Sequence, residues 1–244
     1  MMNILTIIFY QPLLNALVFL YNIIPGHDIG VAIIILTILI KLILYPFSIK
    51  SLKAQKAMQE LQPKIDAIKA QYKNEKEKQA TEMMKLYKDE KISPFSSCLP
   101  LLIQLPFLFA IYQVFMVGLA NNELVGLYSF INNPGNLNKI AFWIFDMSKP
   151  NLVLALVTGL AQFWQTKMLI SKRPEVKGEG SKDEDVASIM NKQMLFMMPI
   201  VTVFIGASLP SGLVLYWLVV NLITVGQQYI AFKKTKSITP VVIN

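Results

Sequence analysis

The fold of this chain is decided by the stretch Val31-Ala-Ile-Ile-Ile-Leu-Thr-Ile-Leu-Ile-Lys-Leu-Ile-Leu-Tyr-Pro-Phe-Ser-Ile49, which is long enough to cross a bilayer and holds one charge, Lys41. In a helix that rises 1.5 Å per residue, Lys41 would lie roughly 12 to 15 Å from either end of this stretch. A lysine side chain cannot reach the interface from that depth, and a charge there costs about 2.5 to 3.5 kcal/mol. We therefore expect Lys41 to face a polar cavity that other helices complete.

Three polar residues are expected on the Lys41 face of this helix. Thr37, Tyr45 and Ser48 lie four before, four after and seven after Lys41, and these spacings place side chains on one face. A purely structural lysine paired with a buried acid is the alternative, but no expected span contains Asp or Glu. A catalytic dyad of Ser48 and Lys41 is excluded, because seven residues separate them by about 10 Å along the helix axis.

The composition is that of a polytopic membrane protein. The 244 residues are 54% hydrophobic and 16% charged, with a mean hydropathy of +0.48, which is too apolar for an ordinary soluble domain. One Cys and one His exclude an intrachain disulfide and argue against a zinc or haem site, so no cofactor is expected. The region Lys50 to Lys91 holds the largest group of lysines and contributes half of the net charge of +8. Retention on the cytoplasmic side explains this cluster, and ribosomal RNA is an alternative partner for it.

Apolar stretches and their polar connections predict an all-α membrane protein with five transmembrane helices. In chain order, the expected segments are an outer interfacial amphipathic helix at residues 1–28, a first span at 29–49, a cytoplasmic antiparallel helical hairpin at 50–93, a second span at 94–119, an outer loop at 120–150, a third span at 151–170, a cytoplasmic loop at 171–191, a fourth span at 192–209, a fifth span at 210–231 and a short basic cytoplasmic tail at 232–244. The lysines of the hairpin and tail place the C-terminus in the cytoplasm and the N-terminus outside.

Residues 1–24 leave two alternatives open. The segment is apolar, but Gln11, Asn15 and Asn22 fall near one helical face and Pro12 follows Gln11. This pattern favours a helix lying in the outer interface over a sixth span, which stays the alternative. No Lys or Arg precedes the apolar run and no small-residue cleavage site follows it, which argues against a signal peptide.

The hairpin and the outer loop each carry one further signal. Apolar residues recur at steps of four and three along the first hairpin arm, as in the seam of a coiled coil, and Pro63 is expected to kink or divide that arm. Whether the hairpin is a rigid spacer or a docking surface is left open. In the outer loop, Phe142 and Trp143 belong to a short amphipathic stretch and suit an interfacial depth.

Polar residues recur on three spans besides the first. The expected groove residues there are Gln104 and Tyr112 on the second span, Thr158, Gln162 and Gln165 on the third, and Trp217, Asn221, Thr224 and Gln228 on the fifth. Hydrogen bonding between helices, worth about 0.6 kcal/mol per contact, is the simpler explanation of any one of them. Polar stripes on several helices together with a buried cation favour a hydrophilic groove inside the bilayer.

No known catalytic motif is present in the sequence. It contains no phosphate-binding Gly-rich loop, no H-E-x-x-H, no G-x-S-x-G and no pair of intramembrane acids, so we expect a protein that is not an enzyme. A transporter or channel for a small solute or ion is the competing class, but the two halves of the chain show no convincing internal repeat. A structural scaffold is a third class, in which the polar stripes could be replaced without loss of activity.

Several separated motifs resemble those of the YidC/Oxa1/Alb3 family of membrane protein insertases. They are Leu44-Tyr-Pro-Phe47, Lys56-Ala-Met-Gln-Glu-Leu-Gln-Pro63, Cys98-Leu-Pro-Leu-Leu-Ile-Gln-Leu-Pro106 with Tyr112, and Pro210-Ser-Gly-Leu-Val-Leu-Tyr-Trp217 with Asn221 and Gln227-Gln-Tyr229. The resemblance spans residues from about 10 to 232, and the motifs occur in the family's order with the expected topology between them.

The resemblance implies an insertase and membrane chaperone of the bacterial inner membrane, with a five-helix core and a groove that opens to the cytosol and is closed toward the outside. Lys41 stands where the family usually has arginine, so its implied role is to attract acidic or polar parts of the incoming chain. Lysine keeps the charge but lacks the planar fork of arginine. The implied partners are nascent membrane proteins and the lipid bilayer, with the ribosome and the Sec translocon as further candidates. The large periplasmic domain of some members and a long basic tail are absent from this sequence.

Overall fold

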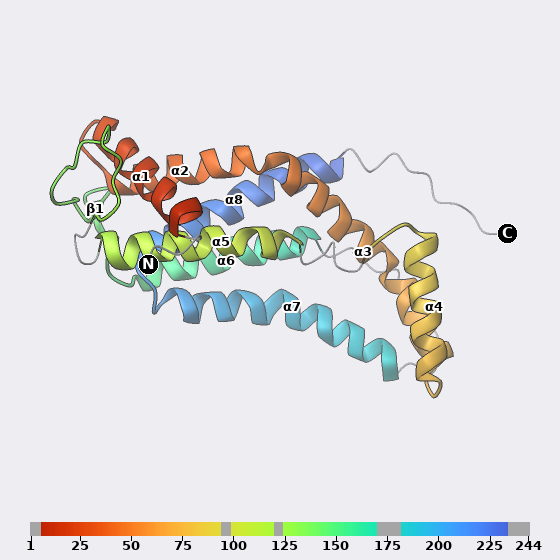
Figure 1. The fold of residues 1–244 in the computed structure, drawn as a ribbon. Helices are drawn as coiled ribbons and strands as arrows, with labels where there is room; N and C mark the ends of the chain where they lie inside the picture. Colours follow the sequence, from red (N-terminus) through yellow and green to blue (C-terminus); the bar gives the residue numbers. More distant parts are fainter. Residues whose placement is uncertain (1–5, 94–98, 120–123, 170–181, 234–244) are drawn as a thin grey trace.

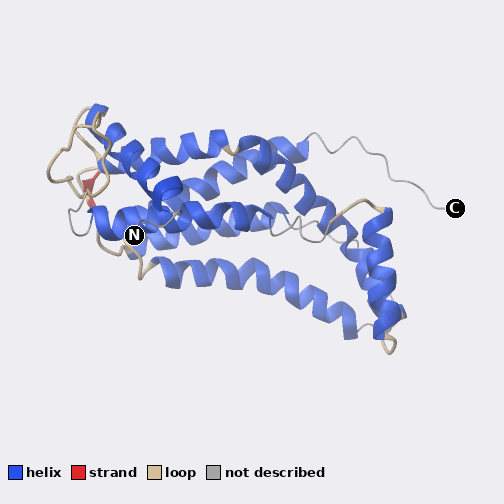
Figure 2. Cartoon of the chain, viewed as in Figure 1, coloured by secondary structure: helices blue, strands red, loops and turns tan. Residues whose placement is uncertain are grey.

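The computed structural model describes residues 6–93, 99–119, 124–169 and 182–233, which are mostly helical (Figures 1 and 2). The elements are η1 (Thr6–Tyr10), α1 (Gln11–Ile23), α2 (Ile29–Ile43), α3 (Tyr45–Gln71), α4 (Lys76–Asp89), α5 (Leu99–Gln113), η3 (Val114–Leu119), β1 (Ile140–Ala141), β2 (Phe145–Asp146), α6 (Leu152–Leu169), α7 (Lys182–Gly206) and α8 (Ser211–Lys233). The start of the expected second span, most of the cytoplasmic loop and most of the basic tail lie outside the described residues.

Helices α2, α5, α6, α7 and α8 run lengthwise through the molecule (Figure 1). Among the described residues, three helices are long and apolar enough to cross a membrane, namely Thr6–Ile23, Leu152–Leu169 and Ser211–Phe232, and α2 with α3 makes a fourth if that bent pair is one span. Shorter apolar helices cover Gln104–Met116 and Leu195–Gly206. The chain is therefore a helical membrane protein with three to four candidate spans in its described part.

Helix α2 is capped at its start and ends early. The Asp28 carboxylate accepts hydrogen bonds from the backbone N–H groups of Gly30 and Val31 at 2.8 and 3.1 Å, which satisfies donors that a helix start leaves free. The helix ends at Ile43, and α3 leaves it at an angle of 71°. Pro46 lies in the first turn of α3, where proline is tolerated, whereas inside a longer α2 its ring would clash with the preceding turn. Residues 29–49 thus do not form the one continuous helix that we expected.

Helix α1 holds the loop between η3 and α6 through its polar residues. The Gln11 and Asn15 amides donate to the Gly126 carbonyl, each at 3.0 Å, and the Asn15 oxygen accepts from the Tyr128 N–H at 2.7 Å. Asn22 donates to the Asn132 carbonyl at 2.7 Å. These contacts explain the polar residues that suggested an interfacial helix, and Thr6–Ile23 also meets the length and composition of a span.

The largest apolar core lies where α1, α2, α5, η3 and the start of α8 meet. Its most deeply buried members include Leu14, Leu17, Val18, Ile29 and Phe115. Close packing at Gly212 is part of this core, since a Cβ added there would lie 2.4 Å from the Phe115 ring. This end of the bundle is therefore filled with apolar side chains.

Helices α6 and α7 present apolar side chains outward. The exposed residues on α6 are Leu152, Val153, Leu156, Val157, Leu160 and Trp164, and those on α7 are Phe196, Met197, Met198, Ile200, Val201, Phe204 and Ile205. So large an exposed apolar surface is expected of a protein whose solvent on that side is lipid.

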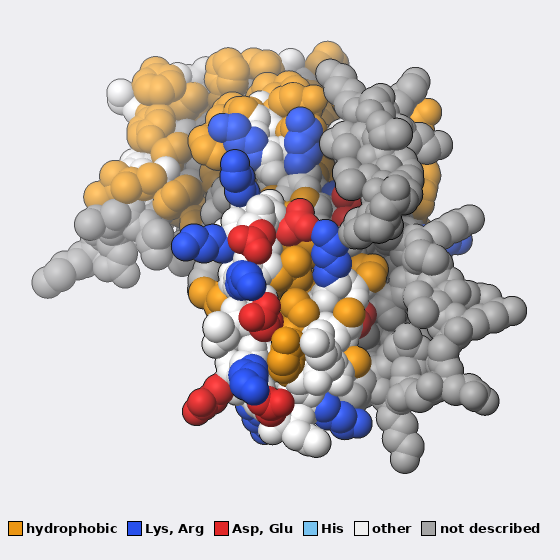
Figure 3. Space-filling view, turned by 90° about the vertical axis from the view of Figure 1, so that its right-hand side faces the viewer, with side chains coloured by type: hydrophobic (Ala, Val, Ile, Leu, Met, Phe, Trp, Pro, Cys, Tyr) orange, Lys and Arg blue, Asp and Glu red, His pale blue; other side chains and the backbone are white. Residues whose placement is uncertain are grey.

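Helices α3 and α4 form the opposite, charged end of the molecule. A turn over residues 72–75 joins them, and they contact each other through a Lys64–Glu90 ion pair and a hydrogen bond from Gln79 to the Lys69 carbonyl. Lysine and acidic side chains gather here, and hydrophobic side chains dominate the region behind (Figure 3). Helix α3 is not divided at Pro63, because it runs from Tyr45 to Gln71 with the proline inside it; the expected kink stays a prediction.

Candidate functional site

Lys41 lies in the last turn of α2 and is 9% exposed. Its Nζ donates a hydrogen bond of 3.1 Å to Oγ1 of Thr224 on α8. Lys41 is twelve residues from the start of α2, about 18 Å along the axis, and Thr224 is thirteen from the start of α8, about 20 Å. Because α8 continues to Lys233, the cation is still deep inside the bundle although α2 itself ends two residues later.

The bend after α2 separates the residues that we expected on the Lys41 face. Thr37 is buried and its hydroxyl donates to the Ile33 carbonyl at 2.6 Å. Tyr45 and Ser48 belong to α3, and Tyr45 is 40% exposed. The argument from helical spacing fails for these two, because it requires one helix and the chain turns at Leu44.

Helix α8 brings a row of polar side chains to this region. Asn221, Thr224 and Gln228 are all buried, and Trp217 is partly buried. The Thr224 hydroxyl also donates to the Val220 carbonyl at 2.7 Å, so it can accept from Lys41 while it donates along its own helix.

Ser51 on α3 and Gln227 on α8 are also buried, and the sequence reasoning did not include them among the expected site residues. Four buried side-chain atoms on α3 and α8 have no hydrogen-bond partner within the described residues: Ser51 Oγ, Asn221 Nδ2, Gln227 Oε1 and Gln228 Oε1. Each such group costs about 1 to 3 kcal/mol if it stays unpaired. Gln227 was missed because the search for polar residues on one helical face included Gln228, and two adjacent residues do not share the centre of one face.

The expected residues on the other helices divide into two groups. Gln104 on α5 donates to the Tyr216 hydroxyl on α8, and Tyr112 is 38% exposed. On α6, the Thr158 hydroxyl donates to the Leu154 carbonyl at 2.8 Å and lies 3.5 Å from the Val214 carbonyl. The Gln162 oxygen accepts from the Thr202 hydroxyl of α7 at 2.6 Å.

Thr158 and Gln162 therefore take part in contacts between helices, which is the simpler of the two roles that their sequence pattern left open. Gln165 is partly buried further along α6. No hydrogen bond described in the structure joins these three residues to Lys41. The polar cluster around the cation is formed by α2 and α8, which the Lys41–Thr224 hydrogen bond joins, and α5 is attached to α8 through the Gln104–Tyr216 hydrogen bond.

The helices that carry the cluster also enclose a small cavity that is mainly apolar. This cavity lies between α1, α2, α5, η3 and α8 and is lined by apolar residues such as Leu17, Ile33 and Phe115, together with Thr37 and Tyr216. The apolar core described above continues from there to the β1–β2 end. The bundle thus changes from apolar packing at that end to unpaired polar groups near Lys41.

The chemistry available at this cluster is that of binding. It offers one cation, amide and hydroxyl groups, and no carboxylate hydrogen-bonded to Lys41 among the described residues. The described residues contain no group of three or more His, Cys, Asp or Glu side chains that could hold a metal ion. Such a site can hold a polar or acidic segment of another molecule.

Comparison with known proteins gives a consistent result. The sequence profile of a family described as the 60Kd inner membrane protein matches residues 19–238. A membrane protein insertase YidC of Clostridium tetani is 38% identical over 210 residues, which cover 86% of this chain and 84% of that protein. The YidC insertases of Syntrophus aciditrophicus and Geobacter sulfurreducens are 37% and 34% identical over 90% of this chain, but the match covers only 35% and 36% of their own lengths.

A solved structure is also similar. A crystal structure of an active YidC insertase, with its first transmembrane domain resolved, superposes with a TM-score of 0.56 at 25% identity. The superposition covers 94% of this chain and 47% of that one. This chain therefore matches most of its short relative and about a third to a half of the longer ones.

Proposed function

Because the chain belongs to the 60Kd inner membrane protein family, which includes the YidC insertases, we propose that it is a membrane protein insertase and chaperone. In this function the protein takes up a nascent hydrophobic segment with its polar flank and releases the segment into the bilayer. The relatives named as insertases support the proposal, and the buried polar cluster around Lys41 is the observation in this chain that carries it.

The proposed membrane arrangement has five spans, made by α2, α5 with η3, α6, α7 and α8. The charged α3 and α4 form a cytoplasmic hairpin, and the β1–β2 loop lies outside. The lysines of α3 and α4 support this orientation through the positive-inside rule. Residues 6–23 lie on or across the outer leaflet. The ribosome and the Sec translocon are proposed partners on the cytoplasmic side.

The proposed groove contains Lys41, Thr224, Asn221 and Gln228, with Thr37 at its outer limit. A polar flank of an incoming chain would cross hydrocarbon at a cost of several kcal/mol per unsatisfied group. The unpaired amides of α8 offer it hydrogen bonds, and the Lys41 ammonium offers a counter-charge for Asp or Glu. The hydrophobic part of the substrate would meanwhile slide along the apolar surface of α6 and α7 toward lipid.

This arrangement does not favour the transporter alternative. A solute pathway must reach both sides of the membrane, whereas the apolar core over α1, α2, α5 and η3 closes the bundle beyond Thr37. We propose that the polar cluster is reached from one side only, so that a substrate that enters it leaves sideways.

Insertion by the purified protein in liposomes tests the proposal. We would compare wild type, Lys41→Ala, Lys41→Glu and Lys41→Arg on two single-span substrates, one with an acidic translocated flank and one with a neutral flank of equal length. We expect Lys41→Glu to reduce insertion of the acidic substrate about tenfold, which corresponds to 1.4 kcal/mol, and Lys41→Arg to retain it.

Full insertion of the acidic substrate by Lys41→Glu would contradict the charged groove. Passage of a small solute without any insertion by wild type would instead support the transporter class.

A further inference from the structure

The turn between β1 and β2 is an apolar tip held in an unusual conformation. The strands pair antiparallel, with Ala141 opposite Phe145, and the Ile144 N–H donates to the Ala141 carbonyl at 3.1 Å. Phe142 and Trp143 both have left-handed backbone angles, with φ of 53° and 58°, which large side chains rarely adopt. Trp143 is 96% exposed and Ile144 is 76% exposed. A turn that faced only water would not be expected to hold exposed, large apolar side chains in this strained backbone conformation.

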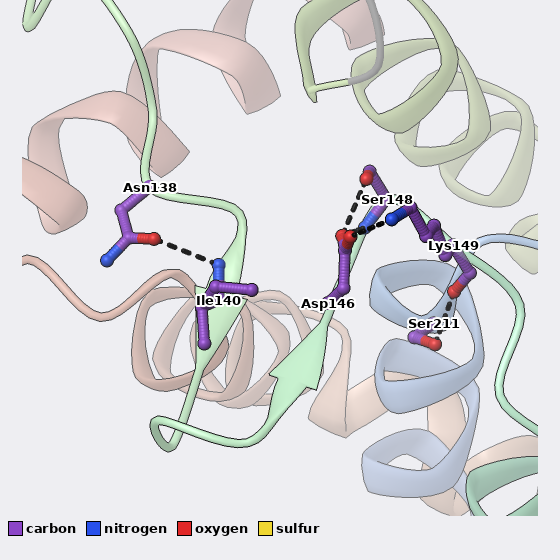
Figure 4. A network of polar contacts seen from close by, with 6 residues as sticks. All are labelled: Asn138, Ile140, Asp146, Ser148, Lys149 and Ser211. Carbon is purple, nitrogen blue, oxygen red and sulfur yellow. Dashed lines mark hydrogen bonds and ion pairs between the residues drawn. The ribbon is translucent and has the colours of Figure 1, made fainter.

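Hydrogen bonds fix this tip at the level where three helices begin. The Phe142 N–H donates at 2.6 Å to the Asp28 carboxylate that caps α2. The chain that follows β2 accepts at Lys149 from the Ser211 N–H and hydroxyl at the start of α8 (Figure 4). Asn151 then caps α6 by accepting from the Leu154 N–H at 3.0 Å. The tip is therefore close to the end of each candidate span that it touches.

Polar groups occupy the base of the β1–β2 hairpin. Asp146 accepts from the Ser148 N–H and hydroxyl at 2.9 and 2.6 Å and pairs with Lys149 at 3.3 Å (Figure 4). A few residues further along the chain, α6 starts with the exposed Leu152 and Val153. Along the chain, the apolar tip is therefore followed by polar groups and then by the apolar start of α6, an order that suits the boundary between headgroups and acyl chains.

We propose that Trp143 and Ile144 insert into the headgroup and acyl boundary of the outer leaflet and anchor the outer ends of α2 and α8 at a fixed depth. We expect lipid to cover Trp143 and Ile144, because the tip lies level with the starts of α2, α6 and α8. A bilayer that surrounds α6 would have its headgroup region at this level. The strained turn aims Trp143 away from the protein, and burial of the indole in the interface compensates for that conformation. The inference rests on the proposed membrane arrangement.

Fluorescence of Trp143 in liposomes tests the anchor. The double variant Trp164→Phe with Trp217→Phe leaves Trp143 as the sole tryptophan. Its fluorescence is measured in lipids brominated either near the headgroup end or near the methyl end of the acyl chain, and with iodide present on both sides. We expect the fluorescence of Trp143 to decrease more with bromine near the headgroup end (shallow) than with bromine near the methyl end (deep), and to decrease little with iodide.

A matched variant keeps Trp164, which is 55% exposed and twelve residues inside α6. Its fluorescence should decrease more with deep bromine, because twelve residues correspond to about 18 Å of helix. Strong iodide quenching of Trp143 without bromolipid quenching would overturn the anchor in favour of a tip in water. Protection from both quenchers would overturn it in favour of a protein contact, such as a second copy. Normal insertion by Trp143→Ser with Ile144→Ser would leave the proposed function intact whichever result the fluorescence gives.

Discussion

Lys41 donates to a neutral hydroxyl in a buried region, so its charge is only partly compensated by the described residues. Burying a cation is costly, and replacing buried ionic groups with apolar ones of similar shape often stabilises a protein. A site that binds charged substrate groups is expected to carry such a cost in the empty state. The energetic argument for Lys41 could be made from the sequence, whereas its hydrogen bond to Thr224 could not, because 183 residues separate the two partners.

We expect Lys41→Met to raise the free energy of unfolding by about 1 to 3 kcal/mol while it lowers insertion of acidic substrates. Methionine keeps the length of the side chain and removes the charge. Unfolding in mixed detergent, followed by intrinsic fluorescence, measures the change. Lys85→Met on α4 is the control, because Lys85 is 65% exposed, and it should change stability by less than about 0.5 kcal/mol. A clear loss of stability in Lys41→Met would show that the cation is well paired.

Two glycines of α8 give opposite expectations for the same substitution. A Cβ at Gly212 would lie 2.4 Å from the Phe115 ring, whereas a Cβ at Gly226 would meet nothing within 4 Å. Gly212→Ala should therefore destabilise the protein by about 1 to 3 kcal/mol. Gly226→Ala should stabilise it by about 0.5 to 1 kcal/mol, because alanine is the better helix former. Thermal unfolding in detergent compares them, and equal effects of the two changes would contradict the packing at Gly212.

At the scale of the helices, the sequence predicted which segments are apolar and which are charged, but it did not predict the bend at Leu44 or the packing of α6 against α7. Composition separated the apolar helices from the charged α3 and α4, because the two groups need different solvents. The break at Leu44 was missed, since hydropathy continues through Pro46 and only the proline marked the possible bend. Gln162 was expected beside Lys41, but its partner Thr202 lies on a helix whose packing the sequence does not reveal.

The link between β2 and α6 should respond to pH through Asp146. Burial raises the pKa of this carboxyl, but hydrogen bonds from Ser148 and the charge of Lys149 outweigh burial and lower the pKa below 3.8. A carboxyl whose pKa is lower in the folded state stabilises the fold above its unfolded pKa, and this contribution disappears as pH falls through the folded value. The difference in melting temperature between wild type and Asp146→Asn should thus be larger at pH 7 than at pH 3.

The variant Ser148→Ala provides a second test of the same contacts, because it removes one hydrogen-bond donor to Asp146. It should reduce the pH dependence without abolishing it. An Asp146→Asn protein that differs from wild type equally at both pH values would show that the carboxylate contributes nothing through its charge.

At the scale of the whole molecule, the α3–α4 end and the β1 end lie at opposite ends of the bundle (Figure 1), and charged side chains gather at the α3–α4 end (Figure 3). The family could be inferred from motifs and composition, and the matching profile confirms it. The number of spans could not be fixed in the same way. Three helices meet the length and composition of a span, and the short apolar segments of α5 and α7 depend on their neighbours for their place in the membrane.

Cysteine labelling in intact cells tests the proposed orientation. In a Cys98→Ser background, a cysteine at Phe130, which is 77% exposed in the outer loop, should react with a membrane-impermeant maleimide. A cysteine at Met84, which is 66% exposed on α4, should react only after the membrane is permeabilised. The reverse pattern would mean that the lysine-rich helices lie outside.

The closed apolar end has a bioenergetic consequence. A bacterial membrane stores energy as a proton gradient and an electrical potential, and a water-filled channel of molecular width would discharge both. In the proposed orientation, the layer around Leu14, Leu17 and Phe115 stands between the polar cluster and the outer surface. An insertase arranged in this way would discharge neither the proton gradient nor the electrical potential.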